Sequence, residues 1–464
     1  MTAAATMSRT VNAPKCSGPA LVPVDIGHAV YAAVTDPATA FWGLVDKTRV
    51  TEALTGGPLF DAYAKDYNRF AKELHALRFE LKPSGVYLNP TERCNLNCTY
   101  CYLPGEQRSS GTHMPLPTLS ASLAKLRDYF ASVMGDTERK PRAIFHGAEP
   151  LMNRDAVFAA IDEFADDFAF GVQTNGTLLD DAAIDFLTSR NVSIGLSLDG
   201  PVAGITDATR RTWGGKSVHD KVLTAMAKLK GYGSWSVITT CNTENLPYLT
   251  RMVELFHAAE VPTCMLNTVR CTLHGARGVK PADGDMAKAF FAALDRTHEL
   301  YRETGRKLMV ANFANILLAI LAPTARRLMC DISPCGGGRA FFALAADGGL
   351  YPCSEFIGLK RFNGGNLLTD GVEAALKSEA FRPVIERDVD TFDPCGSCAI
   401  RHFCGSPCPA EANEMNGGMD KIGAFCDFYK EQVNYALRLI ADGKADDYLW
   451  DGWDENTETT FQMA

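Results

Sequence analysis

The clustering of the cysteines constrains this chain more than any other feature. Of 15 cysteines in 464 residues, three lie close together at Cys94, Cys98 and Cys101, in a C-x3-C-x2-C pattern. Three thiolates on one short loop form a soft ligand set that suits an iron–sulfur cluster or zinc. Structural zinc takes four protein ligands, and His113, twelve residues further on, is too remote to be an obvious fourth. The pattern therefore predicts a [4Fe–4S] cluster with one iron free of protein ligands, and zinc is the alternative.

A second set of cysteines occupies the last third of the chain. Part of it forms a C-x2-C-x5-C-x3-C run. Eight thiolates are the number needed to close two [4Fe–4S] cubes, whereas a pair of zinc-ribbon sites is the alternative interpretation. The set comprises Cys330, Cys335, Cys353, Cys395, Cys398, Cys404, Cys408 and Cys426.

Composition excludes several other classes of protein. The net charge of −9 leaves no basic excess for binding nucleic acid. The best apolar run, 316–322, falls far short of the roughly 20 residues that span a membrane. No basic segment followed by an apolar stretch opens the chain, so we expect a cytoplasmic protein with reduced thiols. The remaining cysteines, Cys16, Cys241, Cys264 and Cys271, are then interpreted as buried free thiols.

Strand-like and helix-like segments alternate between the two cysteine sets, which favours a parallel α/β fold. The expected strands are 86–89, 143–146, 170–173, 192–198, 235–241 and 263–269. The expected helices are 119–134, 155–167, 180–189, 217–230, 246–259 and 285–304. Asp180 and Ser217 stand where helix N-caps are expected.

Three glycine-containing loops follow the second, third and fourth expected strands. They are 146–150 (His-Gly-Ala-Glu-Pro), 173–177 (Gln-Thr-Asn-Gly-Thr) and 197–201 (Ser-Leu-Asp-Gly-Pro). In parallel barrels the reactive loops gather at the carboxyl ends of the strands. Small residues let the backbone approach a ligand, and Glu149 can accept a hydrogen bond from an ammonium group.

In their order behind the cysteine triad, these loops resemble the radical SAM superfamily. In that family the open iron chelates the methionine moiety of S-adenosylmethionine (SAM), and reduction of the cluster yields a 5′-deoxyadenosyl radical. The resemblance implies a partial (β/α)6 barrel, although His146-Gly-Ala departs from the family's Gly-Gly-Glu-Pro. It implies SAM contacts from Tyr100, Gly147, Ala148, Glu149, Thr174, Asn175, Ser197, Asp199 and one of Arg210 and Arg211, because guanidinium matches a carboxylate.

The later cysteines are similar to the SPASM extension of peptide-modifying radical SAM enzymes. This resemblance implies two auxiliary [4Fe–4S] clusters, one held by Cys330, Cys335, Cys353 and Cys408, the other by Cys395, Cys398, Cys404 and Cys426. It implies an N-terminal, candidate substrate-binding region (1–80), the barrel (81–310), the SPASM domain (311–430) and a helix end with an acidic tail (431–464). In the first region helical stretches are expected, notably at 59–78, without a clear pattern of winged-helix strands. We expect the tail to be solvated, and docking through Trp450 and Trp453 is the alternative.

Within that group the chain is most similar to the maturases of quinohemoprotein amine dehydrogenases, over segments 89–102, 145–151, 171–177 and 353–358. The resemblance implies thioether bonds from cysteine sulfur to a methylene carbon of Asp or Glu in the small dehydrogenase subunit, with flavodoxin or ferredoxin as electron donor. Sulfatase maturation to formylglycine is the alternative, but Ser354 stands where those enzymes carry Asp, although Glu355 is adjacent. A non-catalytic iron–sulfur or zinc protein is the alternative from another class. No residue is marked as a catalytic acid or base.

Overall fold

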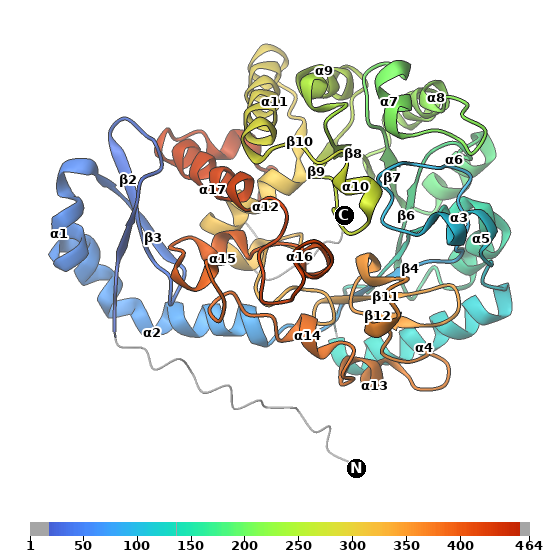
Figure 1. Ribbon diagram of the computed structural model, residues 1–464, viewed down its shortest axis with the longest axis horizontal. Coiled ribbons are helices and arrows are strands. Elements are labelled where there is room, and N and C mark those ends of the chain that lie inside the picture. Colours follow the sequence, from blue (N-terminus) through green and yellow to red (C-terminus); the bar gives the residue numbers. More distant parts are fainter. Residues whose placement is uncertain (1–17, 136, 455–464) are drawn as a thin grey trace.

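The computed structural model describes residues 18–135 and 137–454. Within these residues there are two β-sheets, an antiparallel one of order β1-β2-β3 and a nine-stranded one of order β10-β9-β8-β7-β6-β5-β4-β11-β12 (Figure 1). The strands are β1 (Val22–Val24), β2 (Tyr31–Asp36), β3 (Phe41–Asp46), β4 (Gly85–Leu88), β5 (Arg142–Phe145), β6 (Ala169–Thr174), β7 (Ser193–Ser197), β8 (Trp235–Cys241), β9 (Thr263–Thr268), β10 (Met309–Val310), β11 (Phe341–Leu344) and β12 (Leu350–Tyr351).

Strands β4 to β9 are the six expected strands, and they pair in parallel in chain order. Each crossover between them carries at least one helix, as parallel pairing requires. The predicted parallel α/β fold is confirmed, and every predicted helix has a counterpart. These helices are α4 (Leu116–Met134), α5 (Arg154–Glu163), α6 (Asp181–Ser189), α8 (His219–Leu229), α9 (Leu249–Ala258) and α11 (Asp283–Thr304), whereas α7 (Ala203–Thr209) was not predicted.

The two predicted helix caps have different outcomes. The Asp180 carboxylate accepts a hydrogen bond from the Ala183 amide at 2.9 Å, so Asp180 caps α6 as predicted. The prediction for Ser217 is wrong, because α8 begins after Val218 and no side chain caps it. Val218 is 1% exposed, and burial of this apolar residue fixes the start of α8 instead.

The apolar run at 316–322 belongs to α12 (Ala311–Leu321), which is buried on nearly every side. A helix that is apolar all round belongs in a core, and α12 packs between β9 and α17 (Cys426–Ala441). No helix of the described chain combines the length and apolar character needed to cross a membrane.

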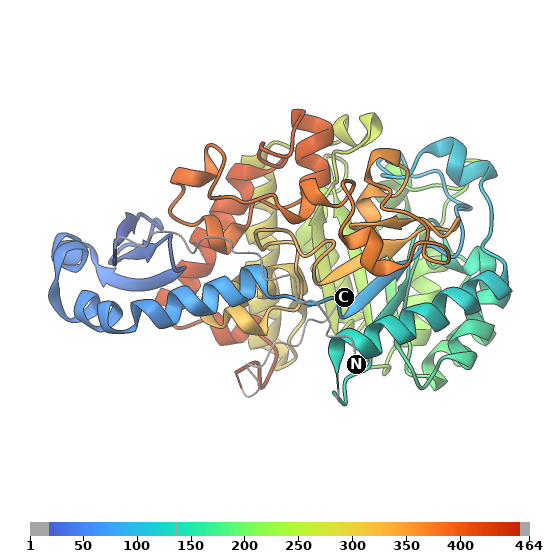
Figure 2. The same ribbon diagram turned by 90° about the horizontal axis from the view of Figure 1, so that it is seen from below.

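The cysteine-rich part of the chain joins the barrel through strand pairing. Strand β11 pairs in parallel with β4 and in antiparallel with β12, so this part continues the main sheet. Beyond these strands it consists mostly of loops and short helices (Figure 2). The short helices here and elsewhere are α3 (Gly105–Ser110), α10 (His274–Arg277), α13 (Val372–Leu376), α14 (Arg382–Ile385), α15 (Arg401–Cys404) and α16 (Pro409–Asn416).

The prediction of a solvated tail is wrong for residues 445–453. Leu449 is fully buried, and the Lys307 ammonium donates to its carbonyl oxygen at 3.0 Å. The Arg327 guanidinium lies 3.8 Å from the centre of the Trp450 ring. The chain therefore packs against the body of the protein as far as Trp453, and the tail from residue 455 lies outside the described residues.

The N-terminal region contains more structure than the sequence indicated. The predicted helix is present as α2 (Gly57–Phe79), preceded by α1 (Val50–Thr55), but the antiparallel sheet β1-β2-β3 was not expected. Val34 and Tyr63 form part of the small core between this sheet and α2. This region extends to one side of the barrel, and α2 leads back to it (Figures 1 and 2).

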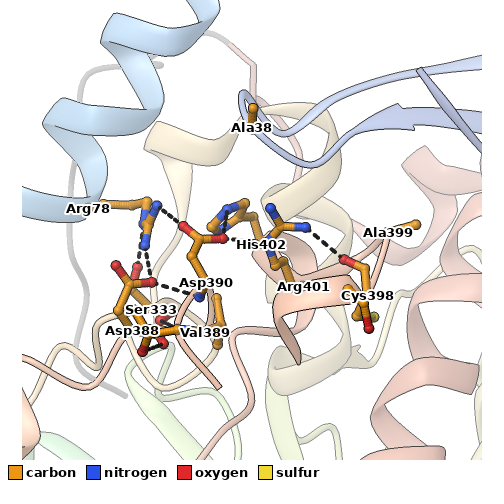
Figure 3. Close-up of polar contacts among 12 residues, drawn as sticks. Ala38, Arg78, Ser333, Asp388, Val389, Asp390, Cys398, Ala399, Arg401 and His402 are labelled. Atoms are coloured by element: carbon orange, nitrogen blue, oxygen red, sulfur yellow. Dashed lines mark hydrogen bonds and ion pairs between the residues drawn. The ribbon is translucent and has the colours of Figure 1, made fainter. Parts of the chain in front are cut away.

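Arg78, in the last turn of α2, ties this region to the cysteine-rich loops. Its buried guanidinium donates to the Ser333 carbonyl at 2.8 Å, to the Asp390 carboxylate at 2.8 Å and to Asp388 (Figure 3). Ser333 lies between two cysteines of the second set, and both aspartates precede the C-x2-C run. One side chain from the N-terminal region therefore joins two separate cysteine loops.

Asp390 also accepts contacts from the loop that carries the next cysteines. Arg401 donates to its carboxylate, and the His402 imidazole lies 3.4 Å from the same oxygen (Figure 3). Arg401 further donates to the carbonyl of Cys398 at 3.1 Å. The contacts with His402, Arg78 and Arg401 hold the pKa of Asp390 well below its usual range against the opposing effect of burial.

Replacing Arg78 should therefore destabilise the protein strongly. We expect Arg78→Met to lower the free energy of unfolding by about 3–5 kcal/mol, because Asp388 and Asp390 lose a buried counterion. The matched control is Arg69→Met, an exposed arginine of the same helix whose ion pairs are worth less than about 1 kcal/mol. Urea unfolding of both variants measures the difference, and equal losses would contradict the anchoring role.

Candidate active site

The cysteine triad lies on the loop that follows β4, at the carboxyl end of the barrel strands. The Cys94 amide donates to the Arg108 carbonyl at 2.9 Å. The Asn97 and Thr99 amides donate to the backbone carbonyls of residues 211 and 209, at 2.8 and 2.9 Å. The loop is therefore fixed by backbone hydrogen bonds on both sides, and its three thiols have defined positions.

The three thiols lie close enough to influence one another. The pKa of Cys94 is raised to about 12 and that of Cys98 to about 11, mainly by burial and in smaller part by charge on Cys101. No three His, Cys, Asp or Glu side chains of the described residues converge on one metal-ion position. A buried thiol group with raised pKa values becomes a set of thiolates when an electropositive centre binds to it.

Glu149 joins the loops that follow β5 and β6. Its fully buried carboxylate accepts from the Thr174 hydroxyl at 2.7 Å, the Asn175 amide at 2.8 Å and the Leu151 amide at 3.2 Å. Burial raises the pKa of Glu149, and these three donors oppose the rise. The residue predicted to bind a ligand ammonium is thus also a brace between two strand-end loops.

The segment around Gly147 approaches the triad loop closely. A Cβ at Gly147 would lie 3.0 Å from the Tyr102 hydroxyl and 3.1 Å from the Asn89 amide nitrogen, and its φ is +22°. The Ala148 amide donates to the Thr91 carbonyl at 3.0 Å. His146, where the family pattern has glycine, has its pKa lowered to about 4 by burial and is therefore neutral at pH 7.

Asn175 connects the β6 loop directly to the triad. Its side-chain amide nitrogen lies 3.8 Å from the Cys94 sulfur and 2.8 Å from the Asn95 side-chain oxygen. The Asn95 amide in turn donates to the Thr177 hydroxyl at 2.8 Å. Ser197, the last residue of β7, lies half-buried at the same end of the barrel.

Arg210 and Arg211 have opposite orientations. Arg210 is buried, donates to the Tyr100 hydroxyl at 2.5 Å and to the Asp199 carboxylate at 3.2 Å, and its charge acts on Cys98. Arg211 is exposed and bonds to the carbonyl of residue 207, so it points away from the predicted site. The pairing of residues 209–212 with the triad loop alternates the side chains, which leaves Arg210 as the inward arginine.

The eight later cysteines form two groups. The inner group comprises Cys330, Cys335, Cys353 and Cys408, which share Arg270 or one another as electrostatic neighbours. The outer group comprises Cys395, Cys398, Cys404 and Cys426, whose charges act on one another. These electrostatic neighbours follow the same division into two sets of four, and the assignment of each set to a cluster stays a prediction. Burial raises the pKa of each inner-group thiol.

The other cysteines are single buried thiols. Cys241, Cys264 and Cys271 are fully buried, as predicted. Cys16 lies outside the described residues.

Several residues of the site lie in segments that contain no recognisable sequence motif. The buried Arg108 guanidinium donates to the Leu103 and Leu96 carbonyls, both at 3.0 Å, and so supports the triad loop from within. Arg270 follows β9 and lies 3.9 Å from Glu411 and 3.5 Å from the Tyr429 hydroxyl. Only the fold brings these residues together, because they come from distant loops.

The residues at this end of the barrel fit a cluster with SAM. The triad offers soft ligands, and two buried polar atoms beside it, the Arg210 Nε and the Asn89 side-chain oxygen, have no hydrogen-bond partner among the described residues. Such orphaned groups are expected where a polar ligand completes the hydrogen bonding. A SAM molecule presents both an ammonium and a carboxylate to such partners.

Removing the charge of Glu149 should weaken this site. We expect Glu149→Gln to reduce SAM affinity at least about tenfold, because the hydrogen bonds to a charged group are worth about 1.5–3 kcal/mol each. Glu163→Gln, an exposed acid on α5, is the control and should bind normally. Isothermal titration of anaerobically reconstituted protein with SAM measures both, and unchanged affinity of the first variant would refute the role of the brace.

Comparison with known proteins identifies the family. Residues 88–256 match the profile of the Radical SAM superfamily. An uncharacterized protein of Archaeoglobus fulgidus is 38% identical over 88% of this chain and 92% of its own length. A cysteine-type anaerobic sulfatase-maturating enzyme of Clostridium perfringens is 22% identical over 78% and 98%.

Solved structures share the fold. The structure of histidine-tagged anSMEcpe with bound AdoMet superimposes with a TM-score of 0.69 at 19% identity, over 80% of this chain and 97% of that one. Streptococcus suis SuiB bound to precursor peptide SuiA gives 0.58 at 11% identity, over 87% and 100%. The chain belongs to the radical SAM superfamily, as a SAM-dependent enzyme with the fold of its peptide-modifying maturases.

Proposed function

We propose that this enzyme forms intrapeptide thioether cross-links, from a cysteine sulfur to a methylene carbon of Asp or Glu, in the small subunit of quinohemoprotein amine dehydrogenase. The observation that carries this proposal is Arg270, a cationic side chain beside the inner group. Its charge lowers the pKa of inner-group thiols, and Glu355 beside it acts on Cys101 and Cys353 alike. An acidic peptide side chain is the substrate group that such a cation would position.

In this proposal Cys94, Cys98 and Cys101 hold a [4Fe–4S] cluster, and the inner and outer groups hold one auxiliary [4Fe–4S] cluster each. The triad cluster, when bound with SAM and reduced, supplies the radical that abstracts hydrogen from an unactivated C–H bond. Flavodoxin or ferredoxin is the proposed source of the electron.

The chain's own residues would position SAM around the triad. Arg210 would donate a hydrogen bond from its unpartnered Nε to the carboxylate of SAM. Its Nη1 donates to Tyr100 and Asp199, which hold the guanidinium in place. Gly147 and Ala148 provide a close backbone approach, and Glu149 keeps the neighbouring loops together. The remaining predicted contacts, Thr174, Asn175 and Ser197, lie on the ends of β6 and β7.

Arg270 would hold the substrate carboxylate. Its side chain is 24% exposed, and its partners bind it weakly, since Glu411 is 3.9 Å away and the Tyr429 hydroxyl 3.5 Å. Glu411 is held instead by the Cys271 amide at 2.8 Å. The guanidinium therefore retains donors for a bidentate contact with an Asp or Glu side chain.

Aromatic side chains would exclude water from the reacting groups. Tyr102 stacks on His146 with ring centres 6.3 Å apart, and Tyr87 meets the edge of His146 at 5.4 Å. Tyr102 is also in the apolar cluster that contains Cys101 and Cys353. These aromatic rings would protect a carbon radical of the substrate from side reactions until the sulfur of the substrate cysteine bonds to that carbon.

The N-terminal region would present the substrate. The solved complex of SuiB with precursor peptide SuiA supports a peptide-binding surface in proteins of this fold. We assign this role to the sheet β1-β2-β3 and helix α2 within residues 1–80, followed by the barrel (81–310), the SPASM domain (311–430) and the C-terminal part (431–464).

Formylglycine formation is the second candidate function. The relatives named as sulfatase-maturating enzymes favour it. The neutral Ser354, where the pattern of those enzymes places a carboxylate, speaks against it. Thioether formation removes two hydrogens from the peptide and keeps the sulfur, whereas conversion of cysteine to formylglycine loses the sulfur. Mass spectrometry of a modified cysteine-containing peptide therefore distinguishes the two.

Cysteine variants separate SAM cleavage from cross-linking. We expect Cys94→Ala to abolish 5′-deoxyadenosine formation, whereas Cys353→Ala and Cys404→Ala retain part of it but form no cross-link. Cys264→Ala, a buried thiol outside the three groups, is the control. Anaerobic assays of 5′-deoxyadenosine and peptide mass test this, and full cross-linking by Cys94→Ala would overturn the proposed function.

Arg270 variants test the substrate class. We expect Arg270→Met to raise the KM for an acidic peptide at least about tenfold, the loss of roughly one charge-assisted hydrogen bond. Arg270→Lys, which keeps the charge, should recover part of the loss, and a peptide with Asn for Asp should be equally poor with all three proteins. Unchanged KM in Arg270→Met would contradict recognition of a carboxylate.

A further inference from the structure

A cavity at the opposite end of the barrel contains two arginines without an acidic partner. It has a volume of about 160 Å³ and lies where strands β5, β7 and β9 begin, far along the barrel from the triad. Arg142, the first residue of β5, and Arg327, which precedes Cys330 in the chain, both line it. Trp450, from the segment after α17, closes its outer side.

Neither guanidinium is neutralised by the described chain. No acid among residues 18–135 and 137–454 comes within ion-pair distance of either arginine, and the buried Arg142 Nε lacks any hydrogen-bond partner there. Burial lowers the pKa of both arginines, and the charge of Arg142 lowers that of Arg327 further. The Trp450 ring, 3.8 Å from Arg327, offers only a cation–π contact.

Two neighbouring cations in a half-buried cavity are unfavourable unless an anion joins them. The wall between them is polar, because the hydroxyls of Ser193, Ser236 and Thr263 belong to residues that line the cavity. Guanidinium pairs match the two oxygens of a carboxylate. An anion here would also close the barrel end remote from the reacting groups, independently of which reaction is catalysed.

We propose that this cavity is an anion-binding site that takes a carboxylate between Arg142 and Arg327. The carboxylate has two possible sources, a free small carboxylic acid or the chain itself. Residues 455–464 follow directly on the segment that carries Trp450 and include Glu455 and Glu458. Glu458 is eight residues beyond Trp450, a separation of up to roughly 26 Å in an extended chain, so its distance along the chain permits this source.

The test compares the full anaerobically reconstituted enzyme with a chain that ends at Asp454, each with and without succinate. If the chain supplies the carboxylate, truncation should lower the melting temperature by about 2–4 °C, and succinate should restore it. If a free acid is the ligand, truncation should have no effect and succinate should raise the melting temperature of both chains. Both outcomes support the site.

The double variant Arg142→Gln/Arg327→Gln decides whether the arginines are responsible. In this variant succinate should no longer raise the melting temperature. If the chain supplies the carboxylate, truncation should also leave the melting temperature of the variant unchanged. The control is Arg127→Gln, an exposed arginine on α4, which should behave as the parent enzyme. Glu455→Gln/Glu458→Gln in the full chain should reproduce the truncation if the tail is the source. Succinate responses that persist in the double arginine variant, or no response of any chain, would overturn the proposal.

Discussion

The pairing of β4 with β11 is the contact on which the arrangement of the site depends. Leu88 and Leu344 lie opposite each other in this parallel pair, and the Asn89 amide continues it to the Leu344 carbonyl at 2.8 Å. The triad loop follows β4, while the hairpin β11–β12 leads to Cys353. Two cysteine sets separated by more than two hundred residues are therefore fixed relative to each other by backbone hydrogen bonds, whose geometry no side-chain substitution easily changes.

The sequence predicted the barrel well because its elements are locally consistent. Each of the six strands is a short apolar run between helices with a clear apolar face, so periodicity alone locates them. The sheet β1-β2-β3 was missed because its strands mix exposed and buried positions without strict alternation. Strands β11 and β12 were missed because they pair with a distant strand and contain few residues.

In the candidate site, too, only the residues that belong to a local sequence pattern could be predicted. Cysteine spacing is a local property, and the triad and later cysteines could be recognised from it. By contrast, Arg108, Arg270 and Glu411 lie in segments with no motif, and only tertiary packing brings them near the thiols. The choice between Arg210 and Arg211 also required the fold, because the backbone pairing of residues 209–212 determines which side chain turns inward.

The contacts of Arg78 give the N-terminal region a mechanical role. Helix α2 is 23 residues long and ends on the loops that carry both later cysteine groups. Because a helix of this length is rigid, a displacement of the sheet β1-β2-β3 would be transmitted to the anchored C-terminal end of α2. Under the proposed function those loops hold two clusters, and the rate of electron transfer between clusters falls steeply with their separation. An insertion that lengthened α2 would then change that separation without touching any cysteine.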